Sequence, residues 1–408
     1  MEIKPRFALI GGIAVGVLAC EASITAPGSC PEFCPNAVIE LVDTVLTGVL
    51  EGDTSFTGYV EPTRANAMQV AGGGAGVESR GVIFFARFGD SAAVDSTARG
   101  LVLRQDSFQL ELVLLSRSPD VTGLQITVHR IDPSANPLGD FTELAPFFED
   151  STIIGIIAIP DAVTADTVSA IIPGDAFPDF EANENQVALG LSIRGTTPAF
   201  ANFRTRETTL GALLTRYVLV GVDSVERSEI RLSEFDTFVD TDLPGPPAGA
   251  LLVGGTPSAR TFLRVNLPPV IVDASEIVRA TLLFVLVEPV LGAPTDTFLV
   301  VAEGLSADFG AKSPILPTPD TLLVRTAVGV GSTDTVSIDI SSLLAFWQNT
   351  PGAVRSLVLH IDGPRQTGVR LNDGEGASVA QIRLASTRIL GMEPTIRVIY
   401  VPPFRFVQ

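Results

Sequence analysis

The sequence predicts an all-β protein made of two tandem antiparallel β-sandwich domains. Short runs rich in Val, Ile, Leu, Phe and Thr, such as FQLELVLL and TLLFVLVE, fit buried or half-buried strands. The 37 Gly and 29 Pro of the 408 residues gather with Asp and Asn between these runs, as expected for turns. Segments also recur in the same order in two halves of the chain, which indicates a duplicated domain.

The N-terminus has the layout of a secretory signal peptide. Lys4 and Arg6 precede an uncharged apolar run from Phe7 to Leu18. As a helix this run would span roughly 18 Å, which is less than the about 30 Å of a membrane's hydrocarbon core. We therefore expect residues 1–19 to be a cleaved signal and the protein to be exported.

Cys20 follows this run directly. Val17, Leu18, Ala19 and Cys20 resemble the bacterial lipobox, in which the cysteine receives a diacylglycerol and becomes the new N-terminus. The resemblance implies that Cys20 is lipidated and that the membrane is a partner through this anchor. Glu21 is not the Asp associated with inner-membrane retention, which favours the outer membrane. The alternative is an ordinary signal peptide that is cut elsewhere and leaves Cys20 free.

The other two cysteines, Cys30 and Cys34, lie in residues 20–36, which we expect to be a tether. In an oxidising compartment they would form a small disulfide loop, and the alternative is two free thiols. A structural zinc site would need further ligands nearby, whereas the histidines of the chain are His129 and His360.

Four pairs of matched segments place the duplicated domains. ESRGVIFF at 78–85 resembles SARTFLRV at 258–265, and DTVSAII at 166–172 resembles DTVSIDI at 334–340. Two further pairs, which begin at residues 185 and 353 and at residues 200 and 379, keep the same order. The matches predict three parts, namely a first β-sandwich at residues 37–222, a charged linker at 223–235 and a second β-sandwich at 236–403.

One short helix interrupts the strand pattern. SSLLAFWQNT has amphipathic spacing, with Ser341 or Ser342 as its expected N-cap. The spacing of Trp347 from Leu343 and Leu344 predicts that the tryptophan packs in the core rather than on the surface.

Composition restricts the class of partner. The net charge of −19 repels nucleic acid and anionic surfaces, so nucleic acid is not an expected partner. With 46% hydrophobic and 18% charged residues the chain is far from a disordered composition.

Several motifs of the second half resemble the DNRLRE-domain family of secreted bacterial proteins. These are DTFVDTDLPGPPAGALLVGG, the strand ARTFLRVNL, the long strand RATLLFVLVE, the segment DTVSIDISSLLAFWQNT and the final PTIRVIYV. The residues that match the family pattern are Arg260, Leu263, Arg264, Leu267, Ala280, Leu282, Trp347 and Tyr400. In the first half, Asp53, Val70, Arg80 and the segment NFRTRE at 202–207 match more loosely.

This resemblance implies a jelly-roll-like β-sandwich and, from family members regarded as carbohydrate-binding modules, binding of polysaccharide. Sugar binding usually needs exposed aromatic platforms. Tyr59, in a loop-like segment, is the candidate platform, and its alternative is a rim tyrosine with no ligand. Arg204 and Arg206 would point to one face of a strand and contact an acidic glycan, although structural pairing with Glu207 is the commoner outcome.

Asp236, Asp240 and Asp242 lie close together in FDTFVDTD. Oxygen ligands on a loop bind calcium, so this segment is a weak calcium candidate, and the alternative is a solvated acidic strand end. We expect no other cofactor. GDS at residues 89–91 lacks the downstream Asp-x-x-His of GDS-type hydrolases, and the chain has no G-x-S-x-G motif, so we expect no enzyme.

The sequence therefore predicts a non-catalytic, lipid-anchored protein of the cell envelope with a binding or adhesion role, whose partner is a polysaccharide. The alternative is a structural envelope protein that acts through protein–protein contacts and has no sugar site. The scarcity of aromatic residues, with one Trp and three Tyr, favours this alternative.

Overall fold

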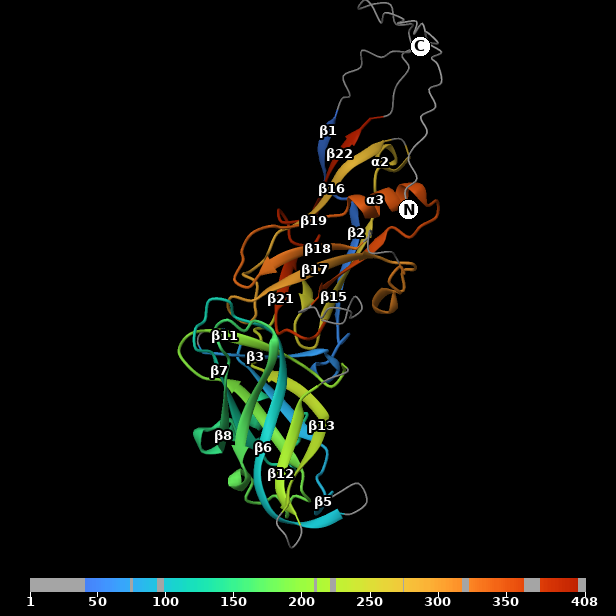
Figure 1. Ribbon diagram of the computed structural model, residues 1–408. Coiled ribbons are helices and arrows are strands. Elements are labelled where there is room, and N and C mark those ends of the chain that lie inside the picture. The colour runs from blue at the N-terminus through green and yellow to red at the C-terminus, as the bar shows by residue number, and fades with distance from the viewer. Residues whose placement is uncertain are drawn as a thin grey trace, which may run out of the picture. The chain divides into compact units, whose positions relative to one another are not determined.

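The computed structural model confirms the all-β fold, and its described strands pair in an antiparallel manner (Figure 1). The structure describes residues 41–402 except 74–75, 94–98, 209–210, 221–224, 274, 318–322 and 363–374. The expected signal peptide, the tether and all three cysteines lie outside these residues. In the part of the chain that is described, no helix is long and apolar enough to cross a membrane.

The first copy is one curled sheet around its own apolar core. Residues 225–232 of β13 pair with β12 and residues 233–240 pair with β4, so this long strand links the two parts of the sheet, which closes partly into a barrel. The strands of this copy are β3 (Ala67–Gly72), β4 (Ser79–Phe85), β5 (Ser91–Ala93), β6 (Arg99–Arg117), β7 (Gln125–Ile131), β8 (Ile153–Ala158), β9 (Asp166–Pro173), β10 (Val187–Ile193), β11 (Ala199–Arg204), β12 (Leu213–Val220) and β13 (Val225–Asp240).

The second copy is a sandwich of two sheets that share a second apolar core. One sheet has the order β1-β22-β16-β19, and the other has the order β18-β17-β20-β15-β14-β21, with β2 paired to β15. The strands are β1 (Val42–Leu46), β2 (Leu50–Thr57), β14 (Ala250–Gly254), β15 (Ala259–Val265), β16 (Glu276–Phe284), β17 (Thr297–Gly304), β18 (Val324–Gly329), β19 (Val336–Asp339), β20 (Ser356–Asp362), β21 (Gln381–Ala385) and β22 (Thr395–Val401).

The two copies repeat the same strand order. The path β11-β3-β4-β10-β7-β8 of the first copy corresponds to β21-β14-β15-β20-β17-β18 of the second, and β13-β12-β6-β9 corresponds to β1-β22-β16-β19. The matched sequence segments lie on corresponding strands, since 78–85 contains β4 and 258–265 contains β15. The duplication seen in the sequence is therefore also present in the topology.

The copies exchange their first strands. Strands β1 and β2 precede the first copy in the chain but pair with β22 and β15 of the second, whereas β13 precedes the second copy and pairs with β12 and β4 of the first. These pairings differ from the predicted boundaries, because residues 42–57 complete the second copy. The predicted linker at 223–235 lies largely in β13, where every second residue from Glu226 to Glu234 is exposed, as in a strand with one face toward solvent.

The helices are short, namely α1 (Phe141–Leu144), α2 (Pro269–Asp273) and α3 (Ser341–Asn349). The expected helix is thus present as α3, and Trp347 is buried in the second core with 3% exposure. The N-cap position is Ile340, without a side-chain cap, and Ser341 Oγ instead accepts a hydrogen bond from the Ala280 N–H at 2.8 Å. Helix α3 occupies the connection from β19 to β20, and the corresponding connection from β9 to β10 contains only the 3-10 turn η4 (Gly174–Ala176).

Candidate ligand-binding groove

The connection from β9 to β10 is held to the first core by aromatic contacts. The ring centroids of Phe177 and Phe180 lie 5.1 and 5.8 Å from that of Phe108 on β6, both in edge-to-face geometry. These contacts anchor the segment without a helix, and they place it beside strands β6 and β12.

A tight turn ends this connection. The Asn185 N–H donates to the Phe180 carbonyl at 2.8 Å, and the Asn185 carbonyl accepts from the Phe88 N–H at 3.0 Å. Glu184 and Asn185 have φ angles of 53° and 58°, a left-handed conformation that Asn tolerates better than most residues. The turn directs the Asn185 amide to Asp90, where Nδ2 donates to Oδ1.

A groove of about 870 Å³ lies between this connection and strands β6 and β12. This volume is within the range of about 300–1,000 Å³ typical of small-molecule sites. Polar side chains of the lining come from four separate segments, namely Asp90, Gln105, Asn185 and Arg216, and the aromatic rings of Phe177 and Phe180 also line it. Exposed Asp179 and Glu181 contribute acidic groups to the lining.

Arg216 is the most constrained polar side chain of the groove, with 4% exposure. Its Nη1 donates to the Gly89 carbonyl at 3.0 Å, its guanidinium carbon lies 4.8 Å from the ring centroid of Phe180, and Glu229 is 3.8 Å away. Burial lowers the pKa of Arg216. Arg216 Nε and Gln105 Oε1 are buried without a hydrogen-bond partner, which is uncommon in folded proteins.

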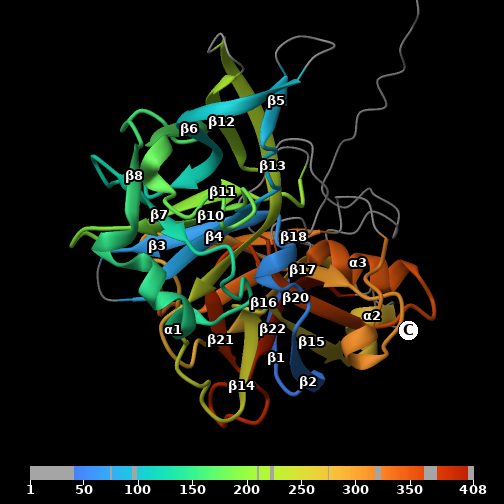
Figure 2. The same cartoon turned by 90° about the horizontal axis from the view of Figure 1, so that it is seen from below.

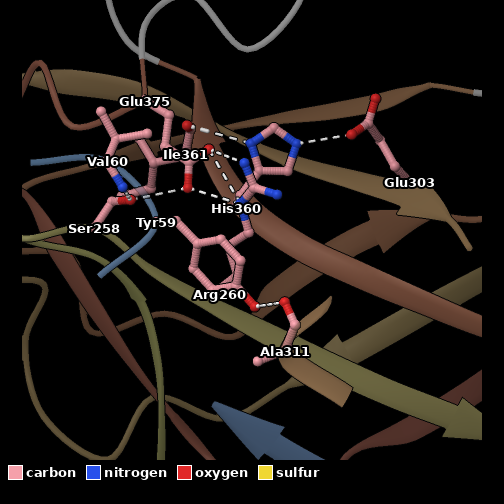
Figure 3. Close-up of polar contacts among 9 residues, drawn as sticks. All are labelled: Tyr59, Val60, Ser258, Arg260, Glu303, Ala311, His360, Ile361 and Glu375. Atoms are coloured by element: carbon pink, nitrogen blue, oxygen red, sulfur yellow. Dashed lines mark hydrogen bonds and ion pairs between the residues drawn. The ribbon is translucent and has the colours of Figure 1, made fainter. Parts of the chain in front are cut away.

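Tyr59, the aromatic platform expected from the sequence, lies in the second copy, half-buried against a small apolar cluster and beside Arg260 (Figure 3). Its hydroxyl donates to the Ala311 carbonyl at 2.7 Å, and the guanidinium carbon of Arg260 lies 4.4 Å from its ring centroid. Arg260 in turn forms a charge-assisted pair with buried Glu375. Burial raises the pKa of Tyr59. A ring covered by a paired arginine is placed for packing rather than for stacking on a sugar.

Arg204 and Arg206 do not share a strand face as expected. Strand β11 ends at Arg204, and the chain then turns, with the Thr205 hydroxyl donating to the Ala65 carbonyl at 2.5 Å. Arg206 is exposed, and its Nε lies 4.0 Å from Glu207 Oε1, which is the structural pairing considered from the sequence. Neither arginine lines the groove.

Asp236 and Asp240 lie in β13, four residues or about 13 Å apart along the strand, and Asp242 lies beyond its end. Asp236 Oδ2 accepts from the Arg206 N–H at 2.8 Å and from the Ser233 hydroxyl at 3.1 Å, while Asp240 accepts from Thr256 at 2.6 Å. Among the described residues, no three His, Cys, Asp or Glu side chains form a group able to hold a metal ion. The calcium candidate is therefore not assembled.

Asp236 has a structural counterpart in Asp53 of β2. Asp236 lies opposite Ile83 of β4, and Asp53 lies opposite the matched residue Leu263 of β15. Asp53 Oδ2 accepts from the Thr387 N–H at 2.5 Å, so each aspartate binds the backbone of the second residue after a strand, β21 or β11. The repeated contact gives Asp236 a structural role.

Both histidines are buried and have partners. His129 Nδ1 lies 3.0 Å from Thr152 Oγ1 and its Nε2 lies 2.8 Å from Ser192 Oγ, and burial lowers the pKa of His129 to about 4. His360 Nε2 lies 3.0 Å from Glu303 Oε2 (Figure 3). Neither histidine lines the groove.

The groove residues Gln105, Asn185 and Arg216 were not identified from the sequence. They are scattered over more than half of the first copy and form no motif of fixed spacing. One feature of the sequence pointed to Arg216, because it interrupts the apolar strand LLTRYVLV. A charged residue in such a strand is seldom buried unless it is paired.

Comparison with known proteins adds little to this geometry. No protein-family model and no curated protein matches the chain. A solved structure of the C-terminal domain of the AgI/II polypeptide BspA from Streptococcus agalactiae has 9% sequence identity and a TM-score of 0.15, and the match covers 73% of this chain and 76% of that chain. A second structure, BspA_C_mut, has 8% identity and a TM-score of 0.15, with 82% and 97% covered. Likeness at this level carries no argument, and the resemblance to the DNRLRE family stays a prediction.

Proposed function

We propose that the protein is a non-catalytic binding protein of the cell envelope that holds a polysaccharide chain in the groove of its first copy. It is exported and held at the outer membrane by a lipid on Cys20. The observation that carries the proposal is the buried, incompletely hydrogen-bonded Arg216 beside a groove that also presents amide, carboxylate and aromatic groups.

The mixture of groups suits a neutral sugar. Hydroxyl groups both donate and accept hydrogen bonds, and the groove lining has donors on Arg104, Asn185 and Arg216 together with carboxylate acceptors on Asp90, Asp179 and Glu181. Phe177 and Phe180 provide apolar surface for the C–H groups of a sugar ring. The three carboxylates of the lining outnumber its two arginines, Arg104 and Arg216, which disfavours an acidic ligand, in agreement with the net charge of −19.

The lining supports binding rather than catalysis. Of the described residues that line the groove, none is His, Ser, Thr, Cys, Lys or Tyr, so the lining holds no Ser–His or Cys–His type of nucleophile–base pair. Asp90 accepts a hydrogen bond from Asn185, which engages one of the three carboxylates. A glycosidase uses two carboxyl groups on opposite sides of the scissile bond, whereas the other two carboxylates, Asp179 and Glu181, lie two residues apart on one segment of the groove lining.

A structural role through protein contacts is the second candidate function. Ile230 and Leu232 project from β13 with exposures of 59% and 56%, and exposed apolar side chains on one strand face favour protein contact. These residues lie outside the groove lining, so the two functions are separable by mutation.

The test uses the left-handed turn. A glycan array of neutral polysaccharides, with and without calcium, selects the probe, and titration calorimetry then compares the protein with Asn185→Gly. Glycine adopts a φ of 58° without strain, so this variant removes only the side chain, and we expect about tenfold weaker binding for the loss of a ligand hydrogen bond.

Glu184→Gly is the matched control, because Glu184 has a similar φ, pairs with Arg87 and does not line the groove. Equal losses in both variants, or no loss in Asn185→Gly, would contradict the proposal. New reducing ends on the bound polysaccharide would show that the groove is catalytic.

A further inference from the structure

Tyr217 is the neighbour of Arg216 on β12 and therefore projects from the opposite face of the strand, away from the groove. It is 36% exposed. Its cross-strand neighbours are Ser228 on β13 and Ser107 on β6. Figures 1 and 2 show β6, β12 and β13 side by side in this part of the first copy. Two serines are too short to cover the faces of a tyrosine ring, so the ring stands open between them.

The ring is also held in place. The Tyr217 hydroxyl donates to Gln109 Oε1 at 2.9 Å, and Gln109 Nε2 donates in turn to Glu111 Oε1 at 3.3 Å. All three residues belong to adjacent strands of one sheet. A side chain that is already ordered loses little conformational entropy when a ligand binds, which favours affinity.

Polar groups surround this aromatic residue. A hollow of about 430 Å³ is lined by Val218 and Leu219 together with Asp106, Ser107, Tyr217, Glu226, Arg227 and Ser228. Asp106 pairs with Arg104 at 2.9 Å, and Arg227 Nη1 donates to the Glu226 carbonyl at 2.9 Å. Short hydroxyl side chains beside an open aromatic ring, with charged groups at the rim, offer one apolar surface and several hydrogen-bonding positions.

The corresponding sheet of the second copy lacks these features in its described residues. On its outer face Arg397 of β22 pairs with Asp43 of β1, and Arg279 of β16 lies 3.8 Å from Asp339 of β19. Ion pairs therefore occupy the surface where the first copy presents Tyr217. The hollow is a property of the first copy and is not a general consequence of the repeated fold.

We infer that the Tyr217 hollow is a second sugar-binding site, which takes a neutral pyranose unit stacked on the tyrosine ring. The apolar face of the pyranose packs on the ring, and its hydroxyl groups exchange hydrogen bonds with Ser107, Ser228 and the rim carboxylates. Asp106 and Glu226 disfavour an acidic sugar. The site is separate from the groove and does not depend on the function proposed for it.

Exposed Ile230 and Leu232 lie further along the same face of β13, so a protein interface is the competing outcome. The observations favour a sugar, because the residues directly opposite the ring are serines and most of the named lining groups are polar. The centre of a protein interface is usually depleted of charged groups.

The test is titration calorimetry on the full-length protein carrying Asn185→Gly, in which we expect the groove to bind about tenfold more weakly. The probes are hexasaccharides of β-1,4-glucose, β-1,3-glucose, β-1,4-xylose and β-1,4-N-acetylglucosamine. For the probe that binds, we expect Tyr217→Ala to weaken affinity about tenfold, which is the effect of losing one aromatic stacking contact, and Tyr217→Phe to stay within about threefold.

Ser228→Tyr covers one face of the ring and should weaken binding as much as Tyr217→Ala, although Tyr217 is still present. Ile230→Ser is the matched control on the same face and should leave affinity unchanged. Circular dichroism during urea titration checks that each variant is folded.

Two results would overturn the inference. One is that no probe binds, or that Tyr217→Ala and Ser228→Tyr bind as well as the parent protein. The other is that sedimentation shows a dimer which both Tyr217→Ala and Ile230→Ser dissociate, since the face would then be a protein interface. Either result leaves the groove proposal standing, because that proposal is tested by Asn185→Gly in the parent protein.

Discussion

The connection from β9 to β10 in the first copy and the connection from β19 to β20 in the second join corresponding strands, yet they fill the adjacent space differently. In the second copy, α3 buries Trp347 in the core, and the inward residues of β22, Ile396 and Val398, are apolar and buried. In the first copy, the connection forms turns around Phe177 and Phe180, and β12 presents Arg216 to the groove.

The difference between the two connections indicates which part of a duplicated fold forms a binding site. The strands of both copies keep the same order, so the framework is constant and the connecting segments vary. A connection that completes the core leaves no room for a ligand, whereas one that stops short leaves a cavity lined by strand residues. Binding residues are often found on loops positioned by a rigid framework, and the first copy fits this rule.

The largest expected effect comes from cutting the chain to separate the copies. A fragment of residues 58–245 contains β3 to β13, and we expect it to unfold cooperatively on its own. A fragment of residues 37–222 lacks β13, so the edges of β4 and β12 lose their partner and we expect no stable fold. Circular dichroism during urea titration measures the unfolding of each fragment. Cooperative unfolding of the 37–222 fragment would contradict the strand exchange.

The next prediction compares the loss of stability on replacing a buried arginine of the first copy with that on replacing an exposed arginine of the second copy. Arg216→Met leaves the Gly89 carbonyl and Glu229 without their buried partner, and we expect a loss of about 4 kcal/mol in the free energy of unfolding. Arg397→Met removes an exposed ion pair with Asp43 and should cost at most about 1 kcal/mol. Urea unfolding at pH 7 measures both. Equal costs would mean that Arg216 is not set apart by its burial.

The smallest effect concerns Asp236, whose pKa burial raises to about 6. The unfolded state releases this proton at lower pH, so the folded protein loses stability as pH rises from about 4 to 6. Asp236→Asn does not titrate, and we expect its unfolding free energy to rise relative to the parent by up to about 3 kcal/mol across this window.

Comparing the variant with the parent at each pH isolates Asp236 from His129, whose pKa of about 4 has the opposite effect on stability in the same range. Urea unfolding at pH 4, 5, 6 and 7 measures the difference. A constant difference between Asp236→Asn and the parent at all four pH values would show that Asp236 is not perturbed.

The all-β fold, the duplication and α3 with its core tryptophan follow from local patterns that the sequence displays directly. Strand alternation, turn residues and the spacing of Leu343, Leu344 and Trp347 are properties of neighbouring residues. The exchange of β1 and β2 with β13 cannot be seen in neighbouring residues, because the choice of partner strand depends on residues hundreds of positions away. The charge of residues 225–234 therefore indicated a linker, although its alternation also fits a strand.

The candidate sites show the same division. Tyr59 lies in TSFTGYVEP and Tyr217 in LLTRYVLV, and neither stretch indicates whether its tyrosine ring is covered. Arg260 covers Tyr59, whereas Ser107 and Ser228 leave Tyr217 open. Arg204 and Arg206 alternate as strand residues should, but β11 ends between them. Cross-strand partners and strand ends are set by tertiary structure, so these sites could not be assigned from the sequence.

The exchanged strands also order events during synthesis. The ribosome makes β1 and β2 first, but Val42 pairs with Tyr400 and Asp53 pairs with Leu263, so both strands wait for partners that are made much later. Strands β3 to β13 are complete once Asp240 has been made. The first copy is thus able to close while the chain is still growing, and the second copy closes only when the last strand joins the first.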